Sequence, residues 1–168
     1  GLYPASGDSD DYMYKDDIGV GMKDTIFAYT PEVGTAFWQP QAEIESTCAE
    51  MVYSNMVLSH MPHKFLTIKE TDPSRISTLT GNFNHEVQRI GLTNGQITVS
   101  IEGLINIQSV GNAIDYNLVV RENSSGSISY VLDPAIQFGD QIKYVLKTDN
   151  GLWTRRDTII KTFGEIAL

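Results

Sequence analysis

Residues 97–102 read Ile-Thr-Val-Ser-Ile-Glu, so that apolar and polar side chains alternate at every position. Residues 142–147 read Ile-Lys-Tyr-Val-Leu-Lys, and Ile142, Tyr144 and Leu146 again occupy alternate positions. A period of two places one side chain in a core and the next in solvent, which is typical of a half-buried β-strand. These two stretches predict that the C-terminal part of the chain is mainly β.

Further stretches on both sides of these two have the apolar content of strands, and turn signals separate them. We expect these strands at residues 65–70, 83–91, 116–121, 127–132 and 152–161. The turn signals are Asn94-Gly95, Ser125-Gly126, Phe138-Gly139-Asp140 and Asn150-Gly151. About seven short strands at this spacing predict an Ig-like antiparallel β-sandwich over residues 65–168.

Residues 1–62 have a different pattern. The apolar run Thr25–Tyr29 is short enough for a buried strand, and residues 40–60 indicate a helix that ends before Pro62. The apolar stripe of this helix consists of Ile44, Cys48, Met51, Val52 and Met56, and we interpret Cys48 as a small core residue. One strand and one helix cannot bury all their apolar surface, so we interpret residues 1–62 as the last strand and helix of a larger α/β domain.

The composition excludes several classes of protein. The net charge is −9, and residues 1–64 carry 10 acidic and 3 basic side chains, a balance of −7. An acidic balance argues against nucleic acid as a partner, because phosphates attract Lys and Arg. No apolar run reaches the roughly 18 residues of a membrane span. Cys48 is the single cysteine, which excludes an internal disulfide. The opening GLYPASGDSDD has neither Met nor an export signal and suggests a fragment of a longer chain.

Three motifs follow one another in the N-terminal part. Residues 3–14 read Tyr-Pro-Ala-Ser-Gly-Asp-Ser-Asp-Asp-Tyr-Met-Tyr, residues 27–34 read Phe-Ala-Tyr-Thr-Pro-Glu-Val-Gly, and Phe37-Trp38-Gln39-Pro40 precedes the helix. This order resembles the end of the catalytic domain of the funnelin family of zinc metallocarboxypeptidases. In that family a tyrosine on a loop precedes a Ser-Gly and an Asp-aromatic pair, a strand then delivers one glutamate into the active site, and a helix closes the domain.

The resemblance implies a role for four residues. Glu32 matches the catalytic general base, which accepts a proton from zinc-bound water and then donates it to the leaving amine. Tyr3 matches the tyrosine that closes over the C-terminal residue of the substrate, and Thr30 matches a position that lines the pocket. Asp10 matches the base of the specificity pocket, where a carboxylate implies preference for a C-terminal Lys or Arg. The implied substrates are therefore the C-termini of peptides or proteins.

Zinc is the cofactor that the resemblance implies, but its ligands, a His-x-x-Glu pair and a distant histidine, precede the tyrosine loop in the family. None of them can lie in this chain, and His60 and His63 do not replace them because a proline separates them and no third ligand has a useful spacing. We therefore expect the chain to require the remainder of the catalytic domain and to be inactive alone.

Calcium is a second candidate metal at Asp8, Asp10, Asp11, Asp16 and Asp17. The spacing differs from an EF-hand loop and favours a polar loop with Asx turns.

Residues 87–92 resemble the domains that follow the catalytic domain in exported Bacteroidetes-type carboxypeptidases, which implies a secreted or cell-surface protein. The alternative is that the chain is a non-catalytic β-sandwich module, with a binding or structural role in a secreted multidomain protein. The sandwich itself contains no catalytic constellation, since its acids and bases are scattered over outward positions.

Overall fold

The structure is a computed structural model and describes residues 9–14, 26 and 28–164. Its contacts divide the chain into two units, Gly1–Pro62 and His63–Leu168. Strands account for 44% of the described residues and helices for 16%, so the mainly β class predicted from the alternating stretches is confirmed.

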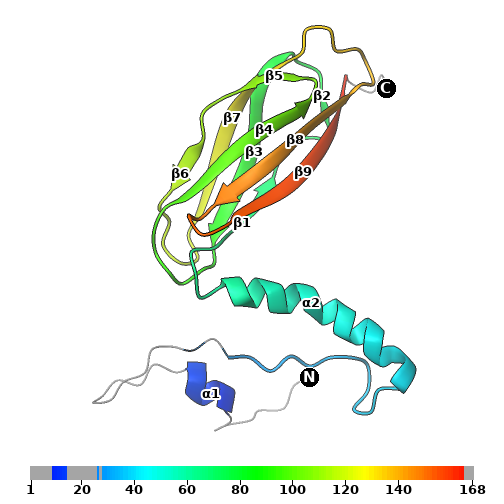
Figure 1. The fold of residues 1–168 in the computed structure, drawn as a ribbon, viewed down its shortest axis with the longest axis vertical. Coiled ribbons are helices and arrows are strands. Elements are labelled where there is room, and N and C mark those ends of the chain that lie inside the picture. The colour runs from blue at the N-terminus through cyan, green and yellow to red at the C-terminus, as the bar shows by residue number, and fades with distance from the viewer. Residues whose placement is uncertain (1–8, 15–25, 27, 165–168) are drawn as a thin grey trace. The chain divides into compact units, whose positions relative to one another are not determined.

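The C-terminal unit is a β-sandwich of two sheets (Figure 1). Sheet A contains, in spatial order, β1 (Leu66–Glu70), β3 (Thr80–Arg89), β7 (Asn123–Leu132) and β5 (Ile107–Val110). Sheet B contains β2 (Arg75–Ile76), β9 (Thr154–Phe163), β8 (Gln141–Asp149), β4 (Ile97–Ile105) and β6 (Ile114–Tyr116). All neighbouring strands are antiparallel except β2, which pairs in parallel with β9.

The alternation in the sequence explains which side chains form the core. In β3, Phe83 is buried while Asn82 and Asn84 on either side of it are exposed. The ring of Phe83 packs between two tyrosines, with centroid distances of 4.4 Å to Tyr130 of β7 and 4.1 Å to Tyr144 of β8. Because β3 and β7 belong to sheet A and β8 to sheet B, these rings join the two sheets.

One predicted strand is wrong. Residues 116–121 do not form a strand, because β6 ends at Tyr116 and a turn follows. The amide of Glu122 donates to the Val119 carbonyl at 3.0 Å, and Arg121 has a φ of 71° that a strand does not allow. The short strands β2 and β5 have too few residues for a periodic pattern, so the sequence did not predict them.

A buried ammonium group connects the two sheets. The side chain of Lys161 on β9 is 1% exposed, and its Nζ lies 2.9 Å from Glu70 Oε1 at the end of β1. The same Nζ donates to the backbone carbonyls of Pro73 at 2.7 Å and Asp72 at 3.3 Å. The charge is therefore neutralised by a carboxylate and surrounded by acceptors, as a buried cation requires.

A histidine and a tyrosine form a second polar contact across the core. His85 of β3 is 2% exposed, and its Nε2 lies 2.8 Å from the hydroxyl of Tyr116 on β6. Gly126, opposite His85 on β7, leaves the space for this contact, because an added Cβ would lie 2.0 Å from the Tyr116 hydroxyl. Burial lowers the pKa of His85, and the carboxylate of Asp72 opposes part of that shift.

In its described part, the N-terminal unit consists of helices and of residues that belong to neither a helix nor a strand. It contains α1 (Ser9–Tyr14), a short 3-10 helix η1 (Gln41–Glu43) and α2 (Ile44–His60). The helix predicted over residues 40–60 is confirmed, and it ends before Pro62, a residue that has no N–H to continue the ladder.

Two further predictions for this unit are wrong. Ile26, Ala28 and Tyr29, the described residues of the predicted strand 25–29, are not in a strand, and Ile26 and Tyr29 are exposed. No described strand pairs with them, and an extended segment without a partner strand does not form a sheet. Cys48 is exposed rather than a core residue, because no side chain of α2 is buried.

Removing one member of the Lys161–Glu70 pair should destabilise the sandwich strongly. We expect Lys161→Met to lower the free energy of unfolding by about 3–5 kcal/mol, because Glu70 then remains as an unpaired, largely buried charge. The double variant Lys161→Met/Glu70→Leu should recover most of this loss. Urea unfolding of the full chain, followed by circular dichroism, measures both changes.

Lys147→Met is the matched control, because it removes the ion pair between Lys147 and Glu102, in which both side chains are partly exposed. This variant should lose less than about 1 kcal/mol. A similar loss for Lys147→Met and Lys161→Met would contradict the role of the buried pair.

The buried histidine should make the sandwich less stable in mild acid. The unfolded chain binds a proton at His85 with the ordinary pKa of 6.5, whereas the folded chain binds it only at lower pH. The free energy of unfolding should therefore fall as the pH drops from 6.5 through the lowered folded-state pKa. Urea unfolding between neutral pH and pH 5 measures this slope.

His85→Leu should flatten the slope, whereas the same change at the exposed His63 should leave it unaltered. An unchanged slope in His85→Leu would assign the pH dependence to other groups.

Candidate functional site

The N-terminal unit brings α1 close to the segment that precedes Glu32. The hydroxyl of Thr30 donates a hydrogen bond to Asp10 Oδ2, although 20 residues separate the two in sequence. The amide of Ile26 donates to the Met13 carbonyl at 2.9 Å, which is a second contact between α1 and the same segment. Two of the four residues that the resemblance singles out, Asp10 and Thr30, are therefore in contact.

The same segment is also attached to α2. The hydroxyl of Tyr29 donates to Asn55 Oδ1 at 2.6 Å, and Asn55 lies in the middle of that helix. Thr30 is adjacent to Tyr29 and Glu32 follows two residues later, so the two hydrogen bonds restrain the backbone that carries all three side chains. Positions on a restrained backbone suit a binding or catalytic site better than a free loop does.

Glu32 is exposed and lies at the rim of a hollow formed by its own loop. Residues 32–37 line a cavity of about 430 Å³, and Phe37 is fully exposed at 101%. The loop turns at Gly34, which has a φ of +78° and packs directly against the side chain of Gln39. A side chain at position 34 would be strained and would collide with Gln39, so glycine is required for this turn.

The structure leaves the remaining predicted residues of the site untested. Tyr3 lies outside the described residues, as do Asp8, Asp16 and Asp17 of the possible calcium loop, and the structure does not describe the side chain of Asp11. Within the described ranges, no three His, Cys, Asp or Glu side chains are grouped so that they could hold a metal ion. The described residues therefore do not fit a zinc site.

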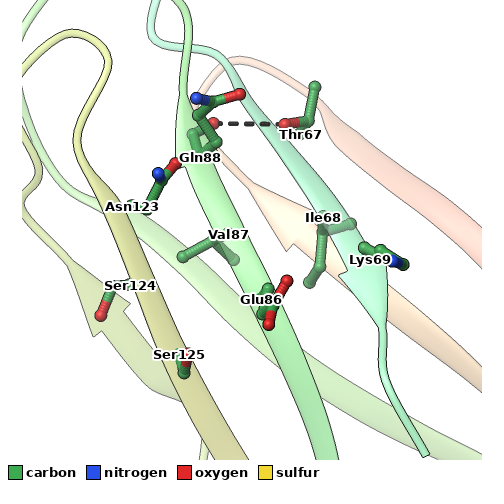
Figure 2. Close-up of a pocket in the computed structure, with 9 residues that line it drawn as sticks. All are labelled: Thr67, Ile68, Lys69, Glu86, Val87, Gln88, Asn123, Ser124 and Ser125. Atoms are coloured by element: carbon green, nitrogen blue, oxygen red, sulfur yellow. Dashed lines mark hydrogen bonds between the residues drawn. The ribbon is translucent and has the colours of Figure 1, made fainter.

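A second hollow lies on the exposed face of sheet A, and sequence reasoning missed it. Figure 2 shows the cavity, of about 540 Å³, that three neighbouring strands line with three residues each. These residues are Thr67, Ile68 and Lys69 of β1, Glu86, Val87 and Gln88 of β3, and Asn123, Ser124 and Ser125 of β7. We call this cavity the sheet A groove. Its only signal in the sequence is the polar half of the strand alternation, which any solvated sheet also shows.

A smaller hollow of about 310 Å³ continues along the same two central strands. It is lined by Thr71, Asn84, His85, Glu86, Ser125, Gly126 and Ser127, and so shares Glu86 and Ser125 with the sheet A groove.

The exposed face of sheet B has a different character. Glu102 of β4 forms ion pairs with Lys147 of β8 at 3.4 Å and with Arg156 of β9 at 2.8 Å. The two cations lower the pKa of Glu102, and the hydrogen bond from Arg156 is the largest cause. This face therefore carries charge, whereas the sheet A groove has one cation and one anion among its nine residues.

Comparison with known proteins identifies no family. No protein-family model matches the chain, and no curated protein matches it either. No helix in the described part of the chain is long and apolar enough to cross a membrane.

Several solved structures are similar at low scores. A FixG-related protein from Vibrio parahaemolyticus is 9% identical with a TM-score of 0.42, over 60% of this chain and 96% of that one. A β-glucosidase from Listeria innocua is 12% identical with the same TM-score, over 63% of this chain and 17% of that one. The PapD-like domain 7 of human CEP192 is 14% identical with a TM-score of 0.38, over 64% and 89% of the two chains. Scores this low carry no argument about function.

Proposed function

We propose that the chain is the C-terminal portion of a secreted zinc-dependent carboxypeptidase that removes C-terminal residues, with a preference for Lys or Arg, from peptides. The observation that carries this proposal is the hydrogen bond between Thr30 and Asp10. The resemblance to the carboxypeptidases implies that both residues belong to one substrate pocket, and the two are in contact although 20 residues separate them in sequence. Two residues that line the same pocket are expected to be in contact, whereas two unrelated residues this far apart in sequence are not.

Each residue would have a defined role in peptide hydrolysis. The water oxygen bonds to the carbonyl carbon, the C–N bond breaks, and the amine nitrogen gains a proton. Glu32 would accept the proton from the water and donate it to that nitrogen, and its exposure leaves it accessible to a substrate. Asp10, oriented by the Thr30 hydroxyl, would pair with the cationic side chain of the terminal residue. Tyr3 would close over that residue.

The zinc of such an enzyme would have to be held elsewhere in the parent protein. The described residues do not fit a zinc site. The roles proposed for this chain are therefore limited to proton transfer and substrate binding by its own side chains. The proposed partners are therefore the remainder of the catalytic domain and the C-terminus of a peptide, and the isolated chain is expected to be inactive.

Replacing the proposed general base should strongly lower the activity of the parent protein. We expect Glu32→Gln to lower kcat about 10²–10⁴-fold on peptides ending in Lys, because the amide cannot accept the proton. Glu50→Gln on α2 is the control, since Glu50 is also exposed but has no assigned role, and it should keep full activity.

The assay is release of the C-terminal residue, with and without added zinc, by the parent and by the 168-residue chain. Activity in the short chain, or equal rates for Glu32→Gln and Glu50→Gln, would rule out the proposed site.

A change at Asp10 should alter specificity rather than the rate of the chemical step. We expect Asp10→Asn to lower kcat/KM for C-terminal Lys and Arg far more than for C-terminal Leu, because only the cationic residues lose an ionic partner. Thr30→Val should shift the preference in the same direction but less, since the carboxylate remains and only its orientation is lost. If all three substrates lost the same factor, Asp10 would not be the specificity residue.

The alternative is a non-catalytic module in which the sandwich binds a ligand or acts as a spacer. The sheet A groove is the observation that favours a binding role, because an inert spacer does not require a hollow in an otherwise regular sheet. The two functions do not exclude each other, since the proposed catalytic residue, Glu32, belongs to the N-terminal unit and the groove to the C-terminal one.

A further inference from the structure

We propose that the sheet A groove is a binding site for a neutral carbohydrate chain. The volume of about 540 Å³ lies within the range of roughly 300–1,000 Å³ that is common for small-molecule sites. The inference rests on the sandwich alone and does not depend on the proposed peptidase activity.

The shape of the groove follows from the side chains that face each other across β3 and β7. Gln88 lies opposite Asn123, Glu86 opposite Ser125, and Asn84 opposite Ser127. Glu86 is longer than the serine opposite it, and Asn84 is larger than its partner serine. The two serine positions therefore form a low strip beside a higher wall on β3. The strip runs from Ser125 through the smaller hollow at Ser127, which extends the polar surface along the two strands to roughly 13 Å.

The hydrogen-bonding groups of the groove are available to a ligand. Lys69, Glu86, Gln88, Asn123 and Ser125 are exposed, and among the described residues none of their side chains forms a hydrogen bond with another. The carboxamides of Gln88 and Asn123 each donate and accept, as does the Ser125 hydroxyl. A sugar hydroxyl also donates and accepts, so this mixture of groups complements a polyhydroxylated chain.

The charge and apolar content of the groove favour an uncharged polar ligand over other classes of ligand. Lys69 and Glu86 are neighbours in the register of β1 and β3, so their charges cancel and the groove attracts neither a polyanion nor a polycation. Val87 is only 2% exposed, and Ile68 packs against the core, so the groove presents no large apolar side chain as an anchor. An amphipathic helix or a phosphate chain therefore fits less well than an uncharged glycan.

The test is an NMR titration of the full 168-residue chain, labelled with ¹⁵N and produced in a bacterial host so that the Asn123-Ser124-Ser125 sequon carries no glycan. The probes are cellohexaose, laminarihexaose, maltohexaose, xylohexaose and chitohexaose, each up to about 10 mM, a range that detects weak binding. We expect at least one sugar to shift the amide signals of residues 67–69, 86–88 and 123–127.

Two variants locate the site. Gln88→Ala/Asn123→Ala should weaken the binding at least about tenfold, because two hydrogen-bonding carboxamides are lost. Thr158→Ala, an exposed position on β9 in sheet B, should bind as the unaltered chain does. Both variants change exposed side chains, and their amide spectra report whether the fold is retained.

Oligogalacturonate and a mixed-sequence peptide complete the titration as a polyanion and a protein-like ligand. The proposal is overturned if no sugar shifts the groove signals, if the shifts map to another surface, or if the double alanine variant binds normally. It is also overturned if the peptide or the polyanion binds in the groove and the sugars do not.

Discussion

The buried ammonium of Lys161 is the constraint on which the arrangement of the sandwich depends. The desolvation of such a group costs several kcal/mol, so the surrounding backbone has to supply partners. The partners are Glu70 at the end of β1 and the carbonyls of Asp72 and Pro73 in the crossover from sheet A to sheet B. β2 begins directly after this crossover and pairs with β9, so one side chain fixes the point at which the chain changes sheets.

The charged side chains on the inner side of β9 have a second consequence. The edge strand of sheet B next to β9 is β2, which has only two residues and therefore pairs with a small part of β9. Arg155 and Asp157, which form an ion pair with an N–O distance of 3.0 Å, are half-buried on the same side of β9 as Lys161. Charges that point inward near an edge disfavour pairing with a strand of another molecule. This edge of sheet B is therefore protected against pairing with another molecule, and the outer faces of the two sheets remain available for function.

The sequence predicted most of the long strands because their alternation is a direct consequence of burial. The turn predicted at Ser125-Gly126 is wrong, because both residues lie inside β7. The sequence could not predict the polar residues of the core, since His85, Arg89 and Lys161 occupy inward positions where the pattern calls for apolar ones. Each of them is accommodated by a contact distant in sequence or by local turn geometry. Arg89, for example, donates to the carbonyls of Gly91 and Gly95 at 3.0 Å and so holds the loop that leads to β4. Such contacts depend on the finished fold and leave no periodic signal.

For the candidate sites the limits of prediction are different. Asp10, Thr30 and Glu32 were predicted as site residues from the order of motifs, and the hydrogen bond between Asp10 and Thr30 was not expected from their spacing. The sheet A groove was not found at all, because its lining residues come from three strands that become neighbours only in the folded sheet. The pairing register decides which side chains lie opposite each other on two adjacent strands, and the register is a property of the folded sheet.

We propose that Asp10, Thr30 and Glu32 form part of a pocket for the C-terminal residue of a peptide. A crystal structure of the parent protein with a bound peptide that ends in lysine tests it most directly. The account predicts the lysine ammonium beside the Asp10 carboxylate, and the Glu32 carboxylate at hydrogen-bond distance, about 3 Å, from the terminal peptide group. A peptide bound on another surface, with Asp10 and Glu32 both facing solvent, would contradict it.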